Sequence, residues 1–217
     1  MATLIKSVSF QNFYNYYGSY EDNEYRFTHG INIINADNNM GKSKFYNGIM
    51  WLIQDQVYDS DLKCFKDANE SLTKMASGKA KAEKKEFEIG VRVVFKNEGV
   101  TYTIKKYALF KTVDSVLGHT SSKLDVMKHE NNADIPILDT EQQKNIINRD
   151  FIPLALRPYA LLQGESMDRL VDLSSIKALS QTIDTLAGIS TLKGVCELTK
   201  SLAKRAEALY KQVDREN

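Results

Sequence analysis

The chain has 217 residues, of which 42% are hydrophobic and 26% are charged, a composition typical of a globular protein. This composition excludes intrinsic disorder as the dominant state, and 11 Gly with 3 Pro exclude collagen-like or low-complexity architectures. Lysine and arginine (29) nearly balance aspartate and glutamate (28), so net charge alone indicates no bulk electrostatic partner, although a local basic surface stays open. The length predicts one domain, or one large lobe with an appendage.

Cysteine usage and the N-terminus indicate the compartment. Cys64 and Cys196 are far apart, and no histidine lies near either of them, which argues against a disulfide framework and against a zinc site. Sparse free cysteine fits a reducing compartment. The N-terminus lacks the apolar run of a signal peptide, and no apolar stretch is long enough to span a bilayer. We therefore expect a cytoplasmic protein with no membrane partner.

The N-terminal region shows the pattern of β-strands. Aromatic and β-branched residues predict strands around 8–13 and 25–27, with a polar turn at 15–23 between them. Gly30 then opens a third apolar run, Ile31–Asn35, which we also expect to be a strand.

A loop over 36–41 follows this run. From Lys42 the apolar residues recur every three or four positions, which predicts a helix that fades near Asp55. The stretch from 59 to 86 is polar and irregular, and we expect it to be a mobile loop with one short helix.

The clearest strands of the chain come next. Apolar residues alternate over 87–95 and again over 100–104, and the turn sequence Asn-Glu-Gly at 97–99 joins the two runs. This pattern predicts a β-hairpin with one buried face, which belongs to an antiparallel sheet. Residues 117–139 are weakly patterned, and 140–148 favour a short helix.

The C-terminal part is dominated by helix from Met167 onward. Leucine and valine then take a heptad-like spacing, interrupted by Arg205, that is typical of the start of a coiled coil. We expect residues 191–217 to form the beginning of that coiled coil. Since no Gly or Pro ends the helix, we also expect that the natural chain continues beyond it.

The strongest motif is the segment Ala36–Ser43, A-D-N-N-M-G-K-S. It matches the phosphate-loop pattern G-x-x-x-x-G-K-[ST] except at its first position. In such a loop the backbone N–H groups point at the phosphates, Lys42 would reach the β- and γ-phosphates, and Ser43 would offer its hydroxyl to Mg²⁺. The candidate nucleotide-binding residues are Ala36, Asp37, Asn38, Asn39, Met40, Gly41, Lys42, Ser43 and Lys44.

Two residues depart from the common pattern. Ala36 needs only a conformation that a small side chain allows, and Asn39 tolerates a positive φ better than other non-glycine residues. The alternative is a Lys-Ser pair that merely caps a helix. The order of apolar run, loop, G-K-S and helix favours the phosphate loop over that alternative.

The other motifs of a complete NTPase are missing from the sequence. There is no N-K-x-D motif for guanine, and the only candidate for a Walker B strand is 135–139, where Pro136 argues against a central parallel strand. We expect Asp139 or Thr140 to be a helix N-cap instead. The incomplete motif set suggests half of a nucleotide-binding domain.

The order of the features resembles one family. Three segments carry the likeness: the strand segment F-Q-N-F-Y-N-Y-Y-G, the segment R-F-T-H-G-I-N-I-I, and the loop and helix A-D-N-N-M-G-K-S-K-F-Y-N-G-I-M-W-L-I. They are similar to the head domains of SMC-type ATPases, such as RecN, RecF, DndD and the coiled-coil ATPase that partners the Mre nuclease. Residues 159–165, Y-A-L-L-Q-G-E, resemble the Q-loop of that family. By this resemblance, Gln163 would coordinate Mg²⁺ and place the attacking water, and so act in catalysis with Lys42.

The resemblance implies an α/β fold of the P-loop NTPase class, with a mixed sheet around the loop, an antiparallel β-lobe and C-terminal helices. Residues 1–190 would be the N-terminal part of an ATPase head. It further implies ATP and Mg²⁺ as cofactors, pairing of two heads, and DNA and a nuclease as partners in repair or anti-phage defence. The C-terminal half of the same ATPase would supply the signature motif, Walker B and the catalytic Glu, so this chain alone should hydrolyse ATP poorly.

Some residues stay ambiguous at this stage. Tyr14 stands where family members often carry a basic residue that contacts the nucleotide; it would either pack near the base or be exposed, and we expect it to be exposed. The lysine-rich run 79–85 is a candidate for DNA contact, although Glu83 dilutes it and a solvated loop is favoured. Further candidates for DNA contact are Lys105, Lys106 and Lys111.

Two other functions remain open. The loop would also serve a small phosphotransferase, but that class needs an acidic acceptor site and an arginine-rich lid, and the arginines here are not clustered. The third alternative is a non-catalytic coiled-coil scaffold with a degenerate loop, which the residues Ala36 and Asn39 would support.

Overall fold

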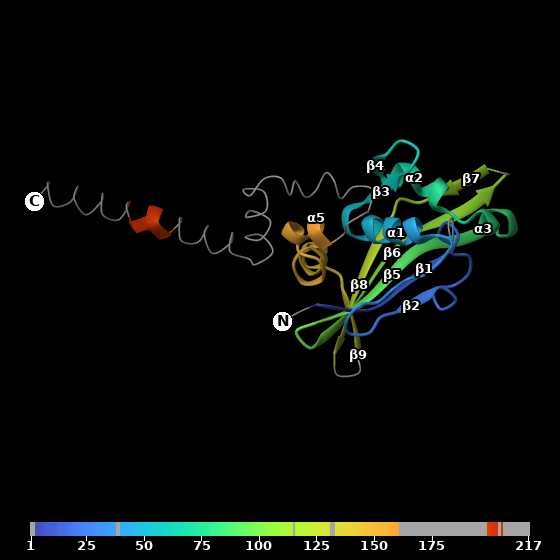
Figure 1. Cartoon of the computed structure of the whole chain (residues 1–217). Coiled ribbons are helices and arrows are strands. Elements are labelled where there is room, and N and C mark those ends of the chain that lie inside the picture. The colour runs from blue at the N-terminus through green and yellow to red at the C-terminus, as the bar shows by residue number, and fades with distance from the viewer. Residues whose placement is uncertain are drawn as a thin grey trace, which may run out of the picture. The chain divides into compact units, whose positions relative to one another are not determined.

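The computed structural model, shown in Figure 1, divides into two units, 1–151 and 152–217. It describes residues 3–37, 40–114, 116–130, 133–160, 199–203 and 205.

The first unit is built on a seven-stranded sheet in which every described pairing is antiparallel. The order along the sheet is β2-β1-β5-β6-β8-β9, and β7 pairs with the C-terminal part of β6. The strands are β1 (Leu4–Gln11), β2 (Glu24–Arg26), β5 (Glu86–Asn97), β6 (Val100–Val113), β7 (Val116–His119), β8 (Lys123–Glu130) and β9 (Ala133–Ile137).

The hairpin of β5 and β6 confirms the alternating pattern. Its two-residue turn, Glu98-Gly99, has positive φ at both positions (49° and 89°), which suits the right-handed twist of the two strands. One face of β5 is apolar and buried through Phe87, Ile89, Val91, Val93 and Phe95. This face forms the floor of the core.

Helix α1 (Lys42–Gln54) covers that floor, and Figure 1 shows it lying over the sheet. Its fully buried Trp51 stacks on Phe13 with ring centroids 5.7 Å apart. Gly48 faces Phe10 so closely that an added Cβ would lie 2.4 Å from the Phe10 ring. The close approach at this glycine sets how deeply α1 sits on β1.

The expectation of a mobile loop over 59–86 is wrong. The segment contains the hairpin β3 (Gln56–Asp59) and β4 (Cys64–Asp67), followed by α2 (Ala68–Met75) and α3 (Gly78–Glu83). These elements are too short to show a period, and tertiary contacts hold them instead. The Asn47 amide of α1, for example, bonds both the N–H and the C=O of Tyr58 at 3.0 Å.

The structure also defines two other segments. Residues 117–139 contain ordered strands, and Pro136 lies in the edge strand β9, where a missing N–H costs least. Residues 31–35 form no strand, because no described strand pairs with them and a strand needs a partner for its backbone groups. As a result, the side chains of Ile31 and Ile33 are 92% and 85% exposed.

The helix predicted over 140–148 is present as α4 (Thr140–Asn145), continued by a π-helical turn, Ile146–Phe151. Asp139 is its N-cap, as expected, and its carboxylate accepts a hydrogen bond from the N–H of Glu141 at 2.9 Å.

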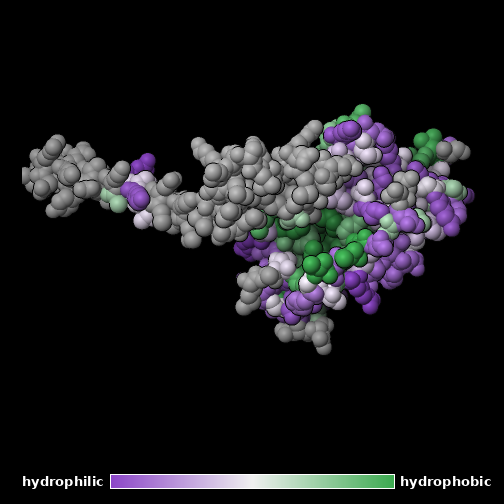
Figure 2. All heavy atoms as spheres, in the orientation of Figure 1, coloured by the Kyte–Doolittle hydropathy of each residue, from purple (hydrophilic) through white to green (hydrophobic). Residues whose placement is uncertain are grey.

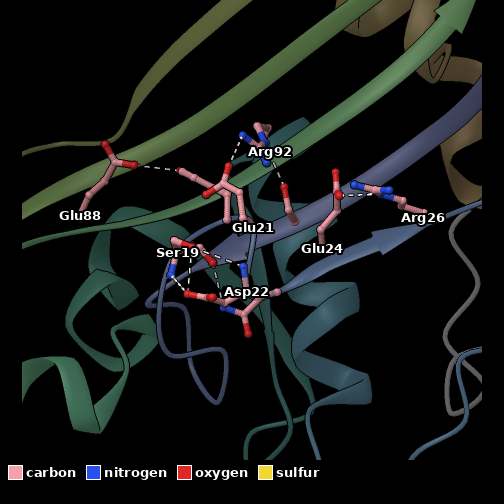
Figure 3. Close-up of polar contacts among 10 residues, drawn as sticks. Ser19, Glu21, Asp22, Glu24, Arg26, Glu88 and Arg92 are labelled. Carbon is pink, nitrogen blue, oxygen red and sulfur yellow. Dashed lines mark hydrogen bonds and ion pairs between the residues drawn. The ribbon is translucent and has the colours of Figure 1, made fainter.

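The face of the sheet opposite α1 is polar, and Figure 3 shows part of it. Tyr20 is buried there and donates to the Glu88 carboxylate at 2.9 Å, over Gly90, where a Cβ would lie 1.9 Å from the Tyr20 hydroxyl. Arg92 donates to Ser9 at 3.0 Å and to Glu21 at 3.1 Å. In the view of Figure 2, hydrophilic colour covers much of the described part, and hydrophobic colour gathers in separate patches.

The second unit is described over short stretches. It has a 3₁₀ turn, Leu154–Leu156, followed by α5 (Arg157–Ala160). Residues 199–203 and 205 are helical, as predicted there. The rest of the predicted C-terminal helices, the boundary at residue 190 and Gln163 lie outside the described residues, and the coiled coil stays a prediction.

The contact between Gly48 and Phe10 yields a test of how α1 is seated. Alanine at an exposed helical position would stabilise by up to about 1 kcal/mol relative to glycine. We expect Gly48→Ala to destabilise instead, by about 1–3 kcal/mol, because the added methyl displaces Phe10. Urea unfolding measures the change. Gly78→Ala is the control, since no atom lies within 4 Å of its added Cβ, and equal effects at both sites would contradict the packing argument.

Candidate functional site

The turn into α1 has the geometry of an anion site. Gly41 is the N-cap with a left-handed backbone (φ 102°), and no side chain caps the helix. The first turn holds no acidic residue. The N–H of Lys44 donates to the Gly41 carbonyl at 2.9 Å, so among the described residues the N–H groups of Lys42 and Ser43 are left for a ligand, and the helix dipole favours a negative one.

Tyr16 fixes this turn from the connection between β1 and β2. Its buried hydroxyl donates to the carbonyl of Gly41 at 3.1 Å, and its ring stacks on Phe10 at 4.4 Å between centroids. Burial raises the pKa of Tyr16, so the phenol stays protonated and remains a donor. Tyr16 could not be found from the sequence, because an aromatic residue 25 positions before Gly41 carries no signal of this contact.

The predicted loop residues that the structure describes do come together. The Lys42 ammonium donates to the carbonyl of Ala36 and, at 3.1 Å, to that of Asp37, so the lysine spans the loop from within. Met40 and Ser43 are exposed beside it. Asn38 and Asn39 lie outside the described residues. These side chains fit a phosphate and a cation, because a phosphate oxygen would replace the loop carbonyls at Lys42 and the Ser43 hydroxyl is open to a metal ion.

Lys44 points to the flank of the helix. Its ammonium lies 4.5 Å from the centre of the Tyr14 ring, and Tyr14 is half-buried, not exposed as we expected. Tyr14 has a positive φ of 47° and donates its N–H to Met75 at 2.6 Å, which fixes its position against α2.

The C-terminal end of α1 is also anchored. Asp55 is the C-cap, with a left-handed φ of 55°, and its carboxylate pairs with the buried Lys106 of β6. Burial lowers the pKa of Lys106, and Asp55 opposes that shift. The pair therefore ties α1 to the middle of the sheet through one buried charge.

Most of the other candidate lysines have protein partners. Lys105 pairs with Glu88 at 3.0 Å, and Lys111 pairs with Glu86. In the run 79–85, which belongs mostly to α3, Lys79 and Lys84 lie over the Tyr17 ring at 4.5 and 5.0 Å. These contacts favour the solvated, intramolecular role for the run.

Two further observations bound the site. A cavity of about 590 Å³ lies along β5, β6 and β7, and no residue of the phosphate loop lines it. Within the described residues, no three His, Cys, Asp or Glu side chains are grouped as a metal cluster, and no helix has the length and apolar character to cross a membrane.

Comparison with known proteins agrees with the geometry at the loop. The model of one family, described as an AAA domain, matches residues 7–216. The chain belongs to this AAA domain family. It is a P-loop ATPase family associated with SMC-like proteins, whose members generally bind ATP with Mg²⁺. No curated protein matches the sequence.

This AAA domain has a mixed α/β fold with a mostly antiparallel sheet.

If Tyr16 fixes its loop, Tyr16→Phe should lower ATP affinity about 3- to 10-fold, since one buried hydrogen bond contributes roughly 1 kcal/mol. Titration calorimetry measures the affinity. Tyr46→Phe, a half-buried tyrosine on α1, is the control for loss of a hydroxyl. Unchanged affinity in Tyr16→Phe would contradict the role.

The Asp55–Lys106 pair should respond asymmetrically to substitution. Asp55→Asn keeps a residue that tolerates the left-handed backbone but leaves Lys106 buried without a counter-charge, so we expect a loss of about 2 kcal/mol. Lys106→Met removes the buried charge and should cost less than about 1 kcal/mol. Chemical denaturation measures the free energy of unfolding of both variants. A larger loss for Lys106→Met than for Asp55→Asn would contradict the role given to this pair.

Proposed function

We propose that this chain is the ATP-binding N-terminal half of an SMC-like ATPase head that acts on DNA, in repair or in anti-phage defence. ATP and Mg²⁺ would bind at the phosphate loop, and pairing of two heads would couple ATP binding to DNA binding or to control of a nuclease. The observation that carries the proposal is the exposed segment directly before the loop, which pairs with no described strand.

That segment has the properties of a strand without its partner. Ile31 and Ile33 alternate with asparagine, and both side chains are almost fully exposed, although isoleucine favours buried strands. An extended run with unpaired backbone groups is the element to which another strand can be added. The segment leads straight into Ala36. We infer that a strand of the C-terminal half pairs with it and completes the sheet around the loop.

The catalytic groups of the sequence also support the proposal that a second half is needed. Asp139, the only sequence candidate for the Walker B carboxylate, is occupied as the N-cap of α4. In the proposed head, Lys42 and Ser43 hold the phosphates and the metal ion, and the other half supplies the carboxylates that activate water. This chain alone is then expected to bind ATP weakly and to turn it over poorly.

The DNA, nuclease and dimer partners rest on the resemblance to SMC-type heads. Most of the described lysines that were candidates for DNA contact are paired or lie on aromatic rings, so we assign DNA binding to the assembled pair of heads and not to these lysines alone.

The exposed segment provides the test. We expect the double substitution Ile31→Asn, Ile33→Asn to leave the unfolding of this chain unchanged, because both side chains are exposed. ATP turnover on adding the C-terminal half as a separate polypeptide should fall about tenfold or more, since a loss of roughly 1.4 kcal/mol in docking is already tenfold. Leu138→Asn is the matched control, with a side chain 85% exposed elsewhere in the same unit.

Other outcomes select the alternatives. Lys42→Ala should abolish ATP binding in any working phosphate loop, whereas near-zero binding in both forms would support the scaffold. Transfer of phosphate to a small acceptor by the chain alone, at an ordinary enzymatic rate, would support a phosphotransferase and overturn the split head.

A further inference from the structure

A hydroxyl, an imidazole and a carboxylate lie in a row across three neighbouring strands of the sheet, β6, β8 and β9 (Figure 1). The hydroxyl oxygen of Thr103 lies 2.7 Å from Nε2 of His129, and Nδ1 of the same ring lies 2.6 Å from a carboxylate oxygen of Asp134. Thr103 is two residues from Lys105, the cross-strand partner of Arg92, so the row lies on the polar face of the sheet, opposite α1.

The donor and acceptor roles along this row follow from its carboxylate end. An ionised carboxylate only accepts hydrogen bonds, so Nδ1 of His129 carries a proton and donates to Asp134. In the neutral ring Nε2 is then the acceptor, and the Thr103 hydroxyl donates to it. This is the arrangement of a nucleophile, a general base and the carboxylate that orients the base, which is recognised by geometry and not by sequence position.

The strands hold this geometry before any reactant arrives. Thr103 is paired with Val94 of β5 on one side and with Met127 of β8 on the other, and its β-branched side chain has few rotamers, so the hydroxyl stays directed at the ring. His129 and Asp134 are direct cross-strand partners. The row is also open to solvent, since the side chains of His129 and Asp134 are 31% and 68% exposed.

We propose that Thr103 is a covalent modification site that accepts the acyl group of an activated ester. Nε2 of His129 takes the proton from the Thr103 hydroxyl while the hydroxyl oxygen attacks the acyl carbonyl carbon. The bond between that oxygen and the acyl carbon forms, and the bond between the acyl carbon and the leaving group breaks. The leaving group departs with the electron pair, and His129 releases the proton. Asp134 is a positioning residue, because it acts only through the ring of His129.

Incubation of the full chain with p-nitrophenyl acetate, followed by mass spectrometry of its peptides, tests the site. The acetyl group should appear on Thr103 about 100-fold faster than on Thr101, the effect of a positioned general base. Thr101 is the internal control, because it lies two residues earlier on the same face of β6 and is also half-buried. Thr103→Ser should keep the reaction at this position, and Thr103→Val, which retains the branched shape, should abolish it.

Two further variants separate a chemical role of the row from a purely structural one. His129→Gln removes the base, so acetylation of Thr103 should fall to the rate of Thr101. Asp134→Asn keeps a hydrogen bond to the ring but removes the charge that stabilises the protonated ring, so the rate should fall about 3- to 10-fold while thermal unfolding matches the wild type.

Two results would overturn the proposal. One is equal acetylation of Thr103 and Thr101 in the wild type. The other is a wild-type rate at Thr103 in His129→Gln or in Asp134→Asn, because the row would then only join the strands.

Discussion

The site depends on one constraint, the left-handed backbone of Gly41 held by the hydroxyl of Tyr16. A helix can present free N–H groups to a phosphate only if the chain enters it without a side-chain cap, and Gly41 provides that entry. The carbonyl of Gly41 accepts the N–H groups of Lys44 and Phe45 at 2.9 Å each. Tyr16 ties the same carbonyl to the core, because its ring is stacked on Phe10 and its hydroxyl donates to the turn. The aromatic core and the anion site are therefore one structure.

The contacts that hold this constraint come from the most interior part of the sheet. Phe10 stacks with Tyr16 and with Phe13, and Phe13 stacks with Trp51 of α1. Strand, connection and helix are thus linked by a continuous series of rings. The loop itself is polar and exposed, so its geometry is determined by residues that no ligand touches.

Local patterns in the sequence predicted the elements that are defined locally. The alternation over 87–104 gave the β5–β6 hairpin, and the G-K-S segment gave α1 with its end at Asp55. The failures have a different origin. Residues 31–35 have strand propensity but no described partner, and the elements between 56 and 86 are too short for a period to appear. The contacts Tyr16–Gly41 and Asp55–Lys106 join residues 25 and 51 positions apart, so only the folded chain reveals them.

Helix α1 is held in place at both of its ends. One end is fixed to the connection after β1 through Gly41, and the other is fixed to β6 through Asp55. Between them, Gly48 leaves no clearance above Phe10 for the helix to roll. A displacement of the phosphate loop would therefore move α1 as a rigid body and reach the centre of the sheet through the Asp55–Lys106 pair.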